Sequence, residues 1–512
     1  MKLLGSVAIL AASLLLCLTV EGEIARLRLG QKGLDYAARV ARHLLQKEAK
    51  IVGIEIPGFS KSALKFYGGS VTRFISPLFR LRAKAPNQLE FQSHAGRVWA
   101  EGRGDLKVTL LTELTRTTSG KLSLEARSCA TDIGDVRLSI DGRGLARVLS
   151  WFRKRIAREM KKQLNSRLCG ELKKVVTSKA NDWLASADLS ISVMSGSELS
   201  LSLAKDPSMA EWMDLFLDGS VKMGSSGAVP IPGIRMPSSP LNNKMLHAWL
   251  ADSAINGVMA AAHSSGRISY TVGRGQLPPE HGSKLRTTCS EDTLIPQCIG
   301  GVLPSLGNKY PNTQAYMILK SREAPKINFT PGKATVQLKA RLEVRVENPV
   351  NALAFAGNLD FSGDLGVKAA TSEGRVVVSG ELLKQSGDIS LVITESTIRE
   401  EVKEKLSFLI ELGEPLILHE LNKRLLEGYR VPTMAHVDIT EPGVAIEDRL
   451  LRLEASVVYR DLERSQRPNQ PLPRGGGGTD CIREREIGED RRGGEGRRGR
   501  EQTRELRDMD EC

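Results

Sequence analysis

The residues that could carry catalysis or bind a metal are few and scattered along this chain. None of the seven histidines is spaced usefully from a carboxylate for general acid–base work. The segment Gly224-Ser225-Ser226-Gly227 lacks the Gly-x-Ser-x-Gly spacing of a hydrolase nucleophile. The sequence contains no Cys-x-x-Cys, and no Cys/His cluster has the spacing of zinc ligands. We therefore expect neither an enzyme nor a metal site, and no cofactor.

The cysteines suggest a different chemistry, because they can form disulfides in an exported protein. Of the seven cysteines, Cys17 lies in an apolar N-terminal run, and Cys481 and Cys512 lie in a polar tail. Segments with the character of folded structure contain the other four, which are Cys129, Cys169, Cys289 and Cys298. Four cysteines allow three pairings, and spacing alone does not choose between them.

Export is itself predicted by the beginning of the chain. Lys2 precedes an apolar run from Leu3 to Val20, and small residues follow where signal peptidase needs them. The run is short for a membrane span, so residues 1–22 are interpreted as a cleaved signal peptide of a secreted, extracellular protein; a retained anchor is the alternative. Asn328-Phe329-Thr330 is a glycosylation sequon, which agrees with secretion and makes Asn328 a candidate glycosylation site.

The excess of positive over negative charge is confined to the first half of the chain. The formal net charge is +13; residues 23–215 hold 33 Lys/Arg against 20 Asp/Glu, whereas residues 216–463 hold 27 against 28. A cationic lobe on an exported protein favours an anionic partner such as phospholipid, endotoxin or sulfated glycan. Nucleic acid would fit the charge, but no recognition motif accompanies it. A basic surface that serves only solubility is the alternative.

Hydrophobic periodicity predicts the elements that must position this charge. Residues 34–48 form an amphipathic helix, and residues 51–140 form antiparallel strands, with Ser119-Gly120 as a turn between Val108–Leu114 and Lys121–Arg127. Apolar residues then recur at three and four positions over residues 144–185, which predicts a helix about 60 Å long. Such a helix must lay its apolar stripe along a groove, which a curved sheet can provide.

The same order of elements appears a second time after a linker rich in Pro, Gly and Ser at residues 225–240. A helix at 245–263 precedes strands at 267–274, 312–322, 333–346 and 352–392, a long helix at 395–428 and a strand at 450–459. Pro415 is expected to kink the long helix. The predicted domains are therefore a basic N-terminal domain (23–224), the linker (225–240), a C-terminal domain (241–463) and a tail (464–512) that is disordered by composition.

Five segments in register resemble the bactericidal/permeability-increasing protein and lipopolysaccharide-binding protein family, over roughly residues 24–460. They are Gln31-Lys32-Gly33-Leu34-Asp35-Tyr36-Ala37, Asn165-Ser166-Arg167-Leu168-Cys169, Lys309-Tyr310-Pro311-Asn312, Leu421-Asn422-Lys423-Arg424-Leu425-Leu426-Glu427-Gly428-Tyr429-Arg430-Val431-Pro432 and Ala455-Ser456-Val457-Val458-Tyr459. No one of these motifs is decisive alone, and their common order carries the resemblance.

The resemblance implies an α+β fold of two similar barrels, each a twisted antiparallel sheet wrapped around a long helix. The barrels would join end to end as a boomerang with a central sheet, and each would hold an apolar pocket for the acyl chains of a bound phospholipid. It also implies a disulfide between Cys129 and Cys169, which leaves Cys289 and Cys298 to close a local loop. Tyr36, Leu44 and Leu45 are candidates for the wall of the first pocket.

The function implied by the resemblance is innate-immune binding of lipopolysaccharide or another anionic bacterial lipid, with antibacterial or endotoxin-neutralising action at the bacterial outer membrane surface. The candidate basic contacts, placed by family analogy, are Lys61, Lys65, Arg97, Arg103 and Lys107. The expected protein is monomeric, binds lipopolysaccharide or phospholipid, and does not bind nucleic acid. Transfer of phospholipid or neutral lipid between extracellular particles, as in other relatives, is the alternative.

Overall fold

The computed structural model describes most of the chain between Gly22 and Gln466. The described residues are 22–48, 52–56, 58–61, 64–66, 69–94, 96–99, 102–134, 137–138, 146–186, 189–194, 196–236, 244–273, 275, 277–289, 298–348, 351–373, 375–383, 388–431 and 436–466. All of them belong to one compact unit. Residues 1–21 of the predicted signal peptide (1–22) and residues 467–512 of the predicted tail (464–512) lie outside the described residues. The last helix, α11 (Arg460–Gln466), extends three residues beyond the predicted start of the tail.

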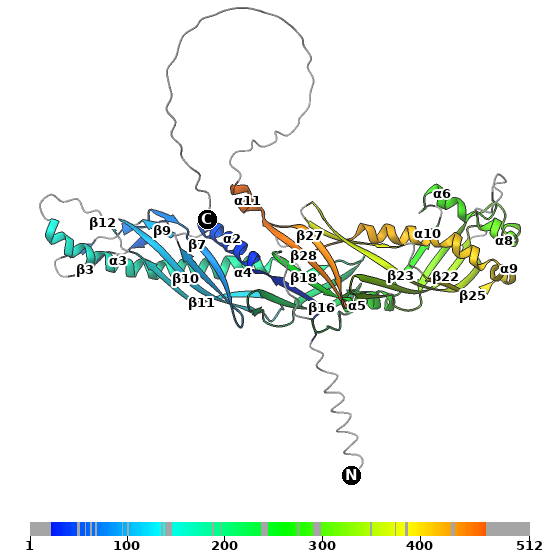
Figure 1. Cartoon of the computed structure of the whole chain (residues 1–512), viewed down its shortest axis with the longest axis horizontal. Helices are drawn as coiled ribbons and strands as arrows, with labels where there is room; N and C mark the ends of the chain where they lie inside the picture. The colour runs from blue at the N-terminus through cyan, green and yellow to red at the C-terminus, as the bar shows by residue number, and fades with distance from the viewer. Residues whose placement is uncertain are drawn as a thin grey trace, which may run out of the picture. The chain divides into compact units, whose positions relative to one another are not determined.

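A central antiparallel sheet of nine strands takes strands from both halves of the chain (Figure 1). Its main path is β13 (Ser190–Ile191), β14 (Ser197–Leu203), β16 (Met213–Met223), β1 (Ala25–Leu29), β18 (Leu246–Ala251), β28 (Leu450–Tyr459) and β27 (Val437–Glu447). The short strands β15 (Ser208–Met209) and β17 (Val229–Pro230) pair with β16. Because β17 lies inside the predicted linker, part of that segment belongs to the central sheet.

Strand β1 holds the two halves together, since it pairs with β16 on one side and with β18 on the other. Leu27 lies opposite Leu215 in the first ladder and opposite Ala248 in the second. The predicted helix at 245–263 was wrong in its first part. Leu246–Ala251 form β18, and helix α5 begins at Asp252 and ends at Ser264.

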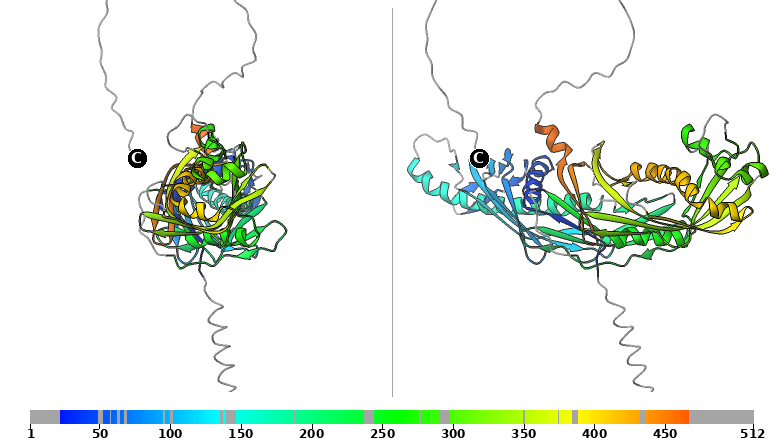
Figure 2. Two further views of the ribbon diagram at one scale, coloured as in Figure 1. Left: turned by 90° about the vertical axis from the view of Figure 1, so that its right-hand side faces the viewer. Right: turned by 45° about the vertical axis from the view of Figure 1, so that its right-hand side comes forward.

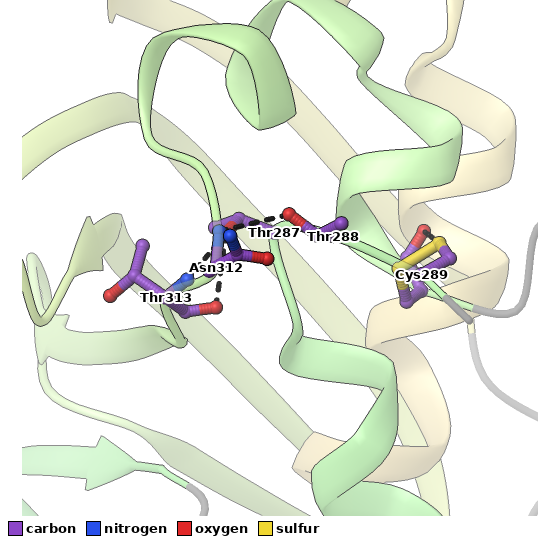
Figure 3. The surroundings of a disulfide bond; sticks show 6 residues. Thr287, Thr288, Cys289, Asn312 and Thr313 are labelled. Carbon is purple, nitrogen blue, oxygen red and sulfur yellow. Dashed lines mark hydrogen bonds between the residues drawn. A yellow bond between two sulfur atoms is a disulfide. The ribbon is translucent and has the colours of Figure 1, made fainter.

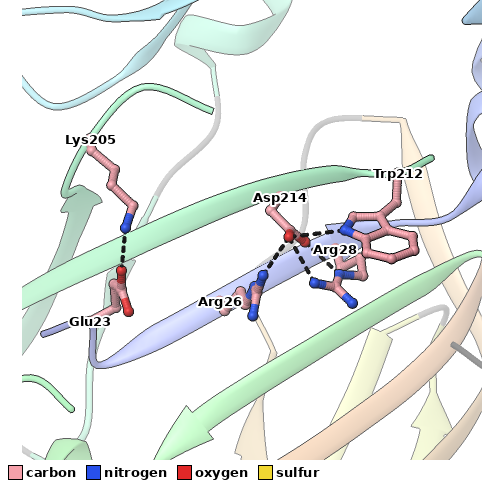
Figure 4. A network of polar contacts seen from close by, with 6 residues as sticks. All are labelled: Glu23, Arg26, Arg28, Lys205, Trp212 and Asp214. Carbon is pink, nitrogen blue, oxygen red and sulfur yellow. Dashed lines mark hydrogen bonds and ion pairs between the residues drawn. The ribbon is translucent and has the colours of Figure 1, made fainter. Parts of the chain in front are cut away.

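One face of this central sheet carries a buried polar cluster (Figure 4). Arg26 donates one hydrogen bond to the carboxylate of Asp214, at 2.5 Å, and Arg28 donates two, at 2.6 and 2.8 Å. Trp212 Nε1 donates to the same carboxylate at 3.1 Å. Arg28 is 0% exposed and Asp214 3%. Buried charges need such pairing, because moving an unpaired ion from water into the protein interior costs about 5 kcal/mol or more.

The N-terminal sheet has seven strands and packs against the helices of the first half (Figure 2). Its path is β6 (Arg73–Ile75), β9 (Gly96–Trp99), β10 (Gly102–Arg116), β8 (Gln88–His94) and β7 (Leu78–Lys84), and β11 (Leu122–Ile133) and β12 (Arg137–Leu138) pair with β10. Side chains alternate along β10, where Leu106, Val108 and Leu110 are buried. The predicted turn at Ser119-Gly120 is confirmed, and Gly120 adopts the positive φ of 74° that glycine tolerates.

Both predicted N-terminal helices are present. The first is α2 (Gln31–Glu48), which packs on β7. The long helix consists of α3 (Ala146–Lys174), a π-helical turn η1 (Val175–Lys179) and α4 (Ala180–Ala185). Leu164, Leu168 and Leu172 form its buried stripe and are at most 2% exposed. The long apolar periodicity therefore predicted the helix correctly but not its π-helical turn.

The C-terminal sheet has eight strands. Its path is β19 (Ser269–Val272), β20 (Ala315–Ser321), β22 (Lys333–Val346), β23 (Ala352–Ser372), β24 (Arg375–Leu382) and β26 (Tyr429–Arg430), with β21 (Lys326–Thr330) on β22 and β25 (Asp388–Ser396) on β23. The predicted helix over 395–428 is interrupted earlier than expected. It divides at Lys405 into α9 (Arg399–Glu404) and α10 (Leu406–Glu427), and Pro415 lies inside α10.

Two disulfides are present, in the pairing that the resemblance implied. Cys129–Cys169 joins β11 to α3, and Cys289–Cys298 closes the loop before α7 (Ile299–Val302). Beside the second bridge, Thr288 Oγ1 accepts from the backbone N–H of Asn312, and Thr287 exchanges hydrogen bonds with Thr313 (Figure 3). A Cβ on Gly300 would lie 1.7 Å from the carbonyl oxygen of Thr287, so this close approach requires glycine.

The buried cluster predicts a large effect of a single isosteric substitution. Asp214→Asn removes the negative charge shared by Arg26 and Arg28, and we expect the free energy of unfolding to fall by about 3–5 kcal/mol. Urea unfolding followed by circular dichroism measures the change. As a matched control, Glu400→Gln removes the carboxylate of the exposed Lys403–Glu400 pair and should change stability by less than about 0.5 kcal/mol. Equal unfolding midpoints for both variants would contradict the importance of this cluster.

Candidate functional site

An apolar cavity of about 280 Å³ lies between the N-terminal sheet, α2, the π-helical turn and the strands β27 and β28. Its wall is almost entirely hydrocarbon. The lining residues are Leu29, Gly33, Tyr36, Ala37, Val40, Ala41, Leu44, Leu45, Phe79, Phe91, Val108, Leu110, Leu124, Leu172, Val175, Val176, Lys179, Ala180, Trp183, Met245, Val437, Val457 and Tyr459. Apolar cavities of roughly 150 Å³ already admit benzene, so this space is large enough for hydrocarbon.

Helix α2 forms one wall through residues spaced three and four apart. Tyr36, Val40 and Leu44 follow one another along this face, with Leu45 beside them. The structure thus places all three predicted pocket residues, Tyr36, Leu44 and Leu45, on the cavity wall. Opposite them, Phe79 and Phe91 pack edge to face with ring centroids 6.2 Å apart.

The π-helical turn lies directly at the cavity. Val175, Val176 and Lys179 belong to this turn and line the space, and Ala180 and Trp183 of α4 continue the wall. A π-turn shifts the register of the following residues, and such turns are frequent at functional sites. The Cys129–Cys169 bridge holds this helix against β11, one to two turns before the π-helical turn.

The second half of the chain closes the cavity of the first. Met245, Val437, Val457 and Tyr459 line it, and the backbone N–H of Tyr459 donates to Tyr36 Oη at 2.6 Å. Tyr36 therefore contributes its ring to the apolar wall while its hydroxyl ties α2 to β28. Sequence periodicity identified the helical wall but not this one, because nothing local to Val437 or Val457 indicates a contact with α2.

The five predicted cationic residues are distributed over two sheets. Lys61 and Lys65 belong to the two-stranded sheet formed by β3 (Phe59–Lys61) and β4 (Leu64–Phe66), whereas Arg97, Arg103 and Lys107 belong to β9 and β10. Arg97 and Lys107 are exposed. The side chains of Lys61, Lys65 and Arg103 lie outside the described structure. The structure therefore brings Arg97, Arg103 and Lys107 into one sheet.

Carboxylates on the neighbouring strands partly neutralise the charge of the two exposed residues, Arg97 and Lys107. Asp105 lies opposite Arg97, and Asp132 lies opposite Lys107. Lys161 of α3 also donates to Asp132 at 2.7 Å, which lowers the pKa of that carboxyl, with a smaller contribution from Lys107. The three cationic side chains of Arg97, Lys107 and Lys161 therefore exceed the two carboxylates that face them by one charge.

The interior of the C-terminal half is filled much more completely. The cavity between α10 and the C-terminal sheet has a volume of only about 60 Å³, and Leu409, Leu416 and Phe355 are among its lining residues. That volume is below what even a small aromatic ligand occupies. The two halves thus share an architecture but not the space left inside it.

Asn328 lies exposed on β21, while Phe329 between the sequon residues is 1% exposed. Among the described residues, His, Cys, Asp and Glu side chains form no cluster of three or more that could hold a metal ion. No helix in the described part of the chain combines the length and apolarity needed to cross a membrane.

The fold and the cavity define a two-half protein whose helices lie on curved antiparallel sheets and leave apolar space inside. Residues 79–179 match the N-terminal domain of the LBP / BPI / CETP family, and residues 198–459 match its C-terminal domain. The chain belongs to this family. The match to the C-terminal domain alone spans more than half of the 512 residues.

Curated relatives cover most of the chain at low identity. Lipopolysaccharide-binding protein of Homo sapiens is 24% identical over 67% of this chain and 69% of its own length. Bactericidal permeability-increasing protein of Rattus norvegicus is 22% identical over 88% of this chain and 97% of its own length. A crystal structure of lipopolysaccharide binding protein superposes with a TM-score of 0.56 at 19% identity, over 86% of this chain and 99% of that one, which supports the fold.

The position of Asn328 leads to a prediction about modification. Because its side chain is exposed on β21, we expect one N-linked glycan there when the chain is secreted from eukaryotic cells. Asn328→Gln should remove the mass of one glycan on denaturing gels, and peptide:N-glycosidase treatment should then cause no further shift at this site. Thr330→Ser keeps the sequon and serves as the control. An unmodified wild-type peptide containing Asn328 in mass spectrometry would refute the prediction.

Proposed function

We propose that this chain is a secreted, non-enzymatic lipid-binding protein that takes acyl chains of lipopolysaccharide or another anionic bacterial lipid into its N-terminal cavity. The observation that carries the proposal is the apolar cavity of about 280 Å³ between α2 and the N-terminal sheet. Hydrophobic transfer would supply most of the affinity, at about 0.8 kcal/mol for each methylene that leaves water. A bound phospholipid is the expected natural occupant.

The charge distribution supports an anionic surface as the target. Residues 23–215 carry the whole positive excess of the chain, and Arg97 and Lys107 are exposed on the N-terminal sheet. Attraction to an anionic lipid surface contributes roughly 1 kcal/mol for each well-placed Lys or Arg. The relatives named for lipopolysaccharide binding and for bactericidal permeability increase agree with this direction.

The cavity can be tested by filling it. Ala41 lines the middle of the α2 wall, so Ala41→Trp should occupy the space and lower the affinity for a fluorescent phospholipid by about tenfold or more. Ala185→Trp makes the same change at an exposed position at the end of α4 and should leave the affinity unchanged. Equal lipid binding by the two variants, with both folded by circular dichroism, would remove the cavity from the proposal.

A salt series separates anionic recognition from lipid transfer. We expect binding to lipid A vesicles to exceed binding to phosphatidylcholine vesicles and to weaken as ionic strength rises, because salt screens exposed charges. Arg97→Gln with Lys107→Gln should reduce the preference several-fold, while Lys368→Gln with Arg375→Gln, exposed in the second half, should not. Binding that ignores both lipid charge and salt would favour transfer of phospholipid or neutral lipid instead.

A further inference from the structure

A second cavity lies outside the C-terminal barrel interior, between α10 and the segment that leads into α6 (Pro279–Gly282). It is open to solvent, and its volume is about 640 Å³. Its lining residues are Gly275, Leu277, Pro278, His281, Pro415, His419, Asn422, Lys423 and Leu426. In Figure 1, α6 lies close to α10 on the side away from the C-terminal strands β22 and β23.

This cavity and the small interior one share no lining residue. Pro415, His419 and Leu426 recur at helical spacing and line the outer cavity. Leu409, Gly413 and Leu416 line the interior cavity instead. The outer cavity is therefore separate from the barrel interior, and it is remote in the chain from the residues of α2 that line the N-terminal cavity.

The polar groups of the outer cavity are cationic or imidazole in character. Lys423 is exposed, and within the described residues no carboxylate pairs with it. The rings of His281 and His419 lie 5.4 Å apart, and the buried Nδ1 of His281 has no hydrogen-bond partner in the described structure. A buried polar atom without a partner destabilises the protein, so a ligand that forms a hydrogen bond with it gains affinity.

The remaining polar group on this face is already occupied. The Asn422 amide donates to the Leu382 carbonyl at 3.2 Å, and its oxygen accepts from the Leu382 N–H at 2.7 Å. This side chain fastens α10 to β24. Recognition in the cavity is thereby left to Lys423 and the two imidazoles, and no carboxylate is among the lining residues.

The other walls are apolar and partly open to solvent. Leu277 and Pro278 lie on one side, and Pro415 and Leu426 lie on the other. Leu426 is 53% exposed and adds an apolar side chain to the open rim of the cavity. Hydrocarbon next to a cation and two imidazoles is the combination that an anionic amphiphile requires.

We propose that this outer cavity is a second lipid site that binds an anionic amphiphile with a single alkyl chain. The headgroup, a phosphate or a carboxylate, contacts Lys423, His419 and His281. The alkyl chain lies along Leu277, Pro278 and Leu426. This site acts independently of the N-terminal cavity, so the protein carries two lipid sites of different chemistry: one almost purely apolar and one that selects the charged head of its ligand.

Photocrosslinking on the full-length protein tests the site directly. The probes are dodecyl phosphate and dodecanoate, each with a diazirine in the alkyl chain, and labelled peptides are mapped by mass spectrometry. We expect saturable labelling of peptides that contain residues 277–281 or 415–426. Lys423→Gln and His419→Gln should each raise the half-saturating probe concentration about five- to tenfold at these peptides. Labelling of α2 peptides in the N-terminal cavity should not change.

Lys405→Gln neutralises an exposed lysine next to α10 and outside the cavity, and it should leave labelling unchanged. The more tightly bound probe identifies the headgroup as phosphate or carboxylate. Competition by inorganic phosphate at the same concentration as dodecyl phosphate would overturn the amphiphile assignment. Labelling confined to the N-terminal cavity, or identical curves for Lys423→Gln, His419→Gln and the wild type, would overturn the site while leaving the first cavity untouched.

Discussion

The structure depends on one pairing, in which the first strand of the described chain lies between strands from its two halves. β1 forms ladders with β16 and β18. On one face of the sheet, its residues Arg26 and Arg28 share the carboxylate of Asp214 from β16. Backbone hydrogen bonds fix the register, and the buried ion cluster penalises any arrangement that separates Arg28 from Asp214.

The two halves of the protein, in each of which helices lie on a curved sheet, differ in the volume left empty inside. In the N-terminal half the apolar side chains of α2, β8 and β10 stop short of one another and leave about 280 Å³. In the C-terminal half, leucines of α10 reach the sheet and leave about 60 Å³. Close packing is the usual state of protein interiors, so the empty half is the one that indicates a ligand.

Local periodicity explains what could be predicted from the sequence. The apolar stripes of α2 and α3 and the alternation in β10 depend on neighbours along the chain, and these elements were predicted correctly. The strand β18 was missed because His247 and Trp249 are buried on the polar face of the central sheet, which hides the alternation. The family resemblance gave the Cys129–Cys169 pair. The outer cavity on α10 had no signal, because its two walls are about 140 residues apart in the chain.

The hydrogen bond from Tyr459 to Tyr36 has a thermodynamic consequence. Since Val457 and Tyr459 complete a cavity that otherwise belongs to the first half, occupancy of that cavity and the seating of β28 are linked equilibria. A ligand that prefers the closed wall strengthens the attachment of the last strand, and loosening of that strand must weaken the ligand by the same factor. Any ligand held in this cavity would therefore be retained only as long as β28 stays attached to the central sheet.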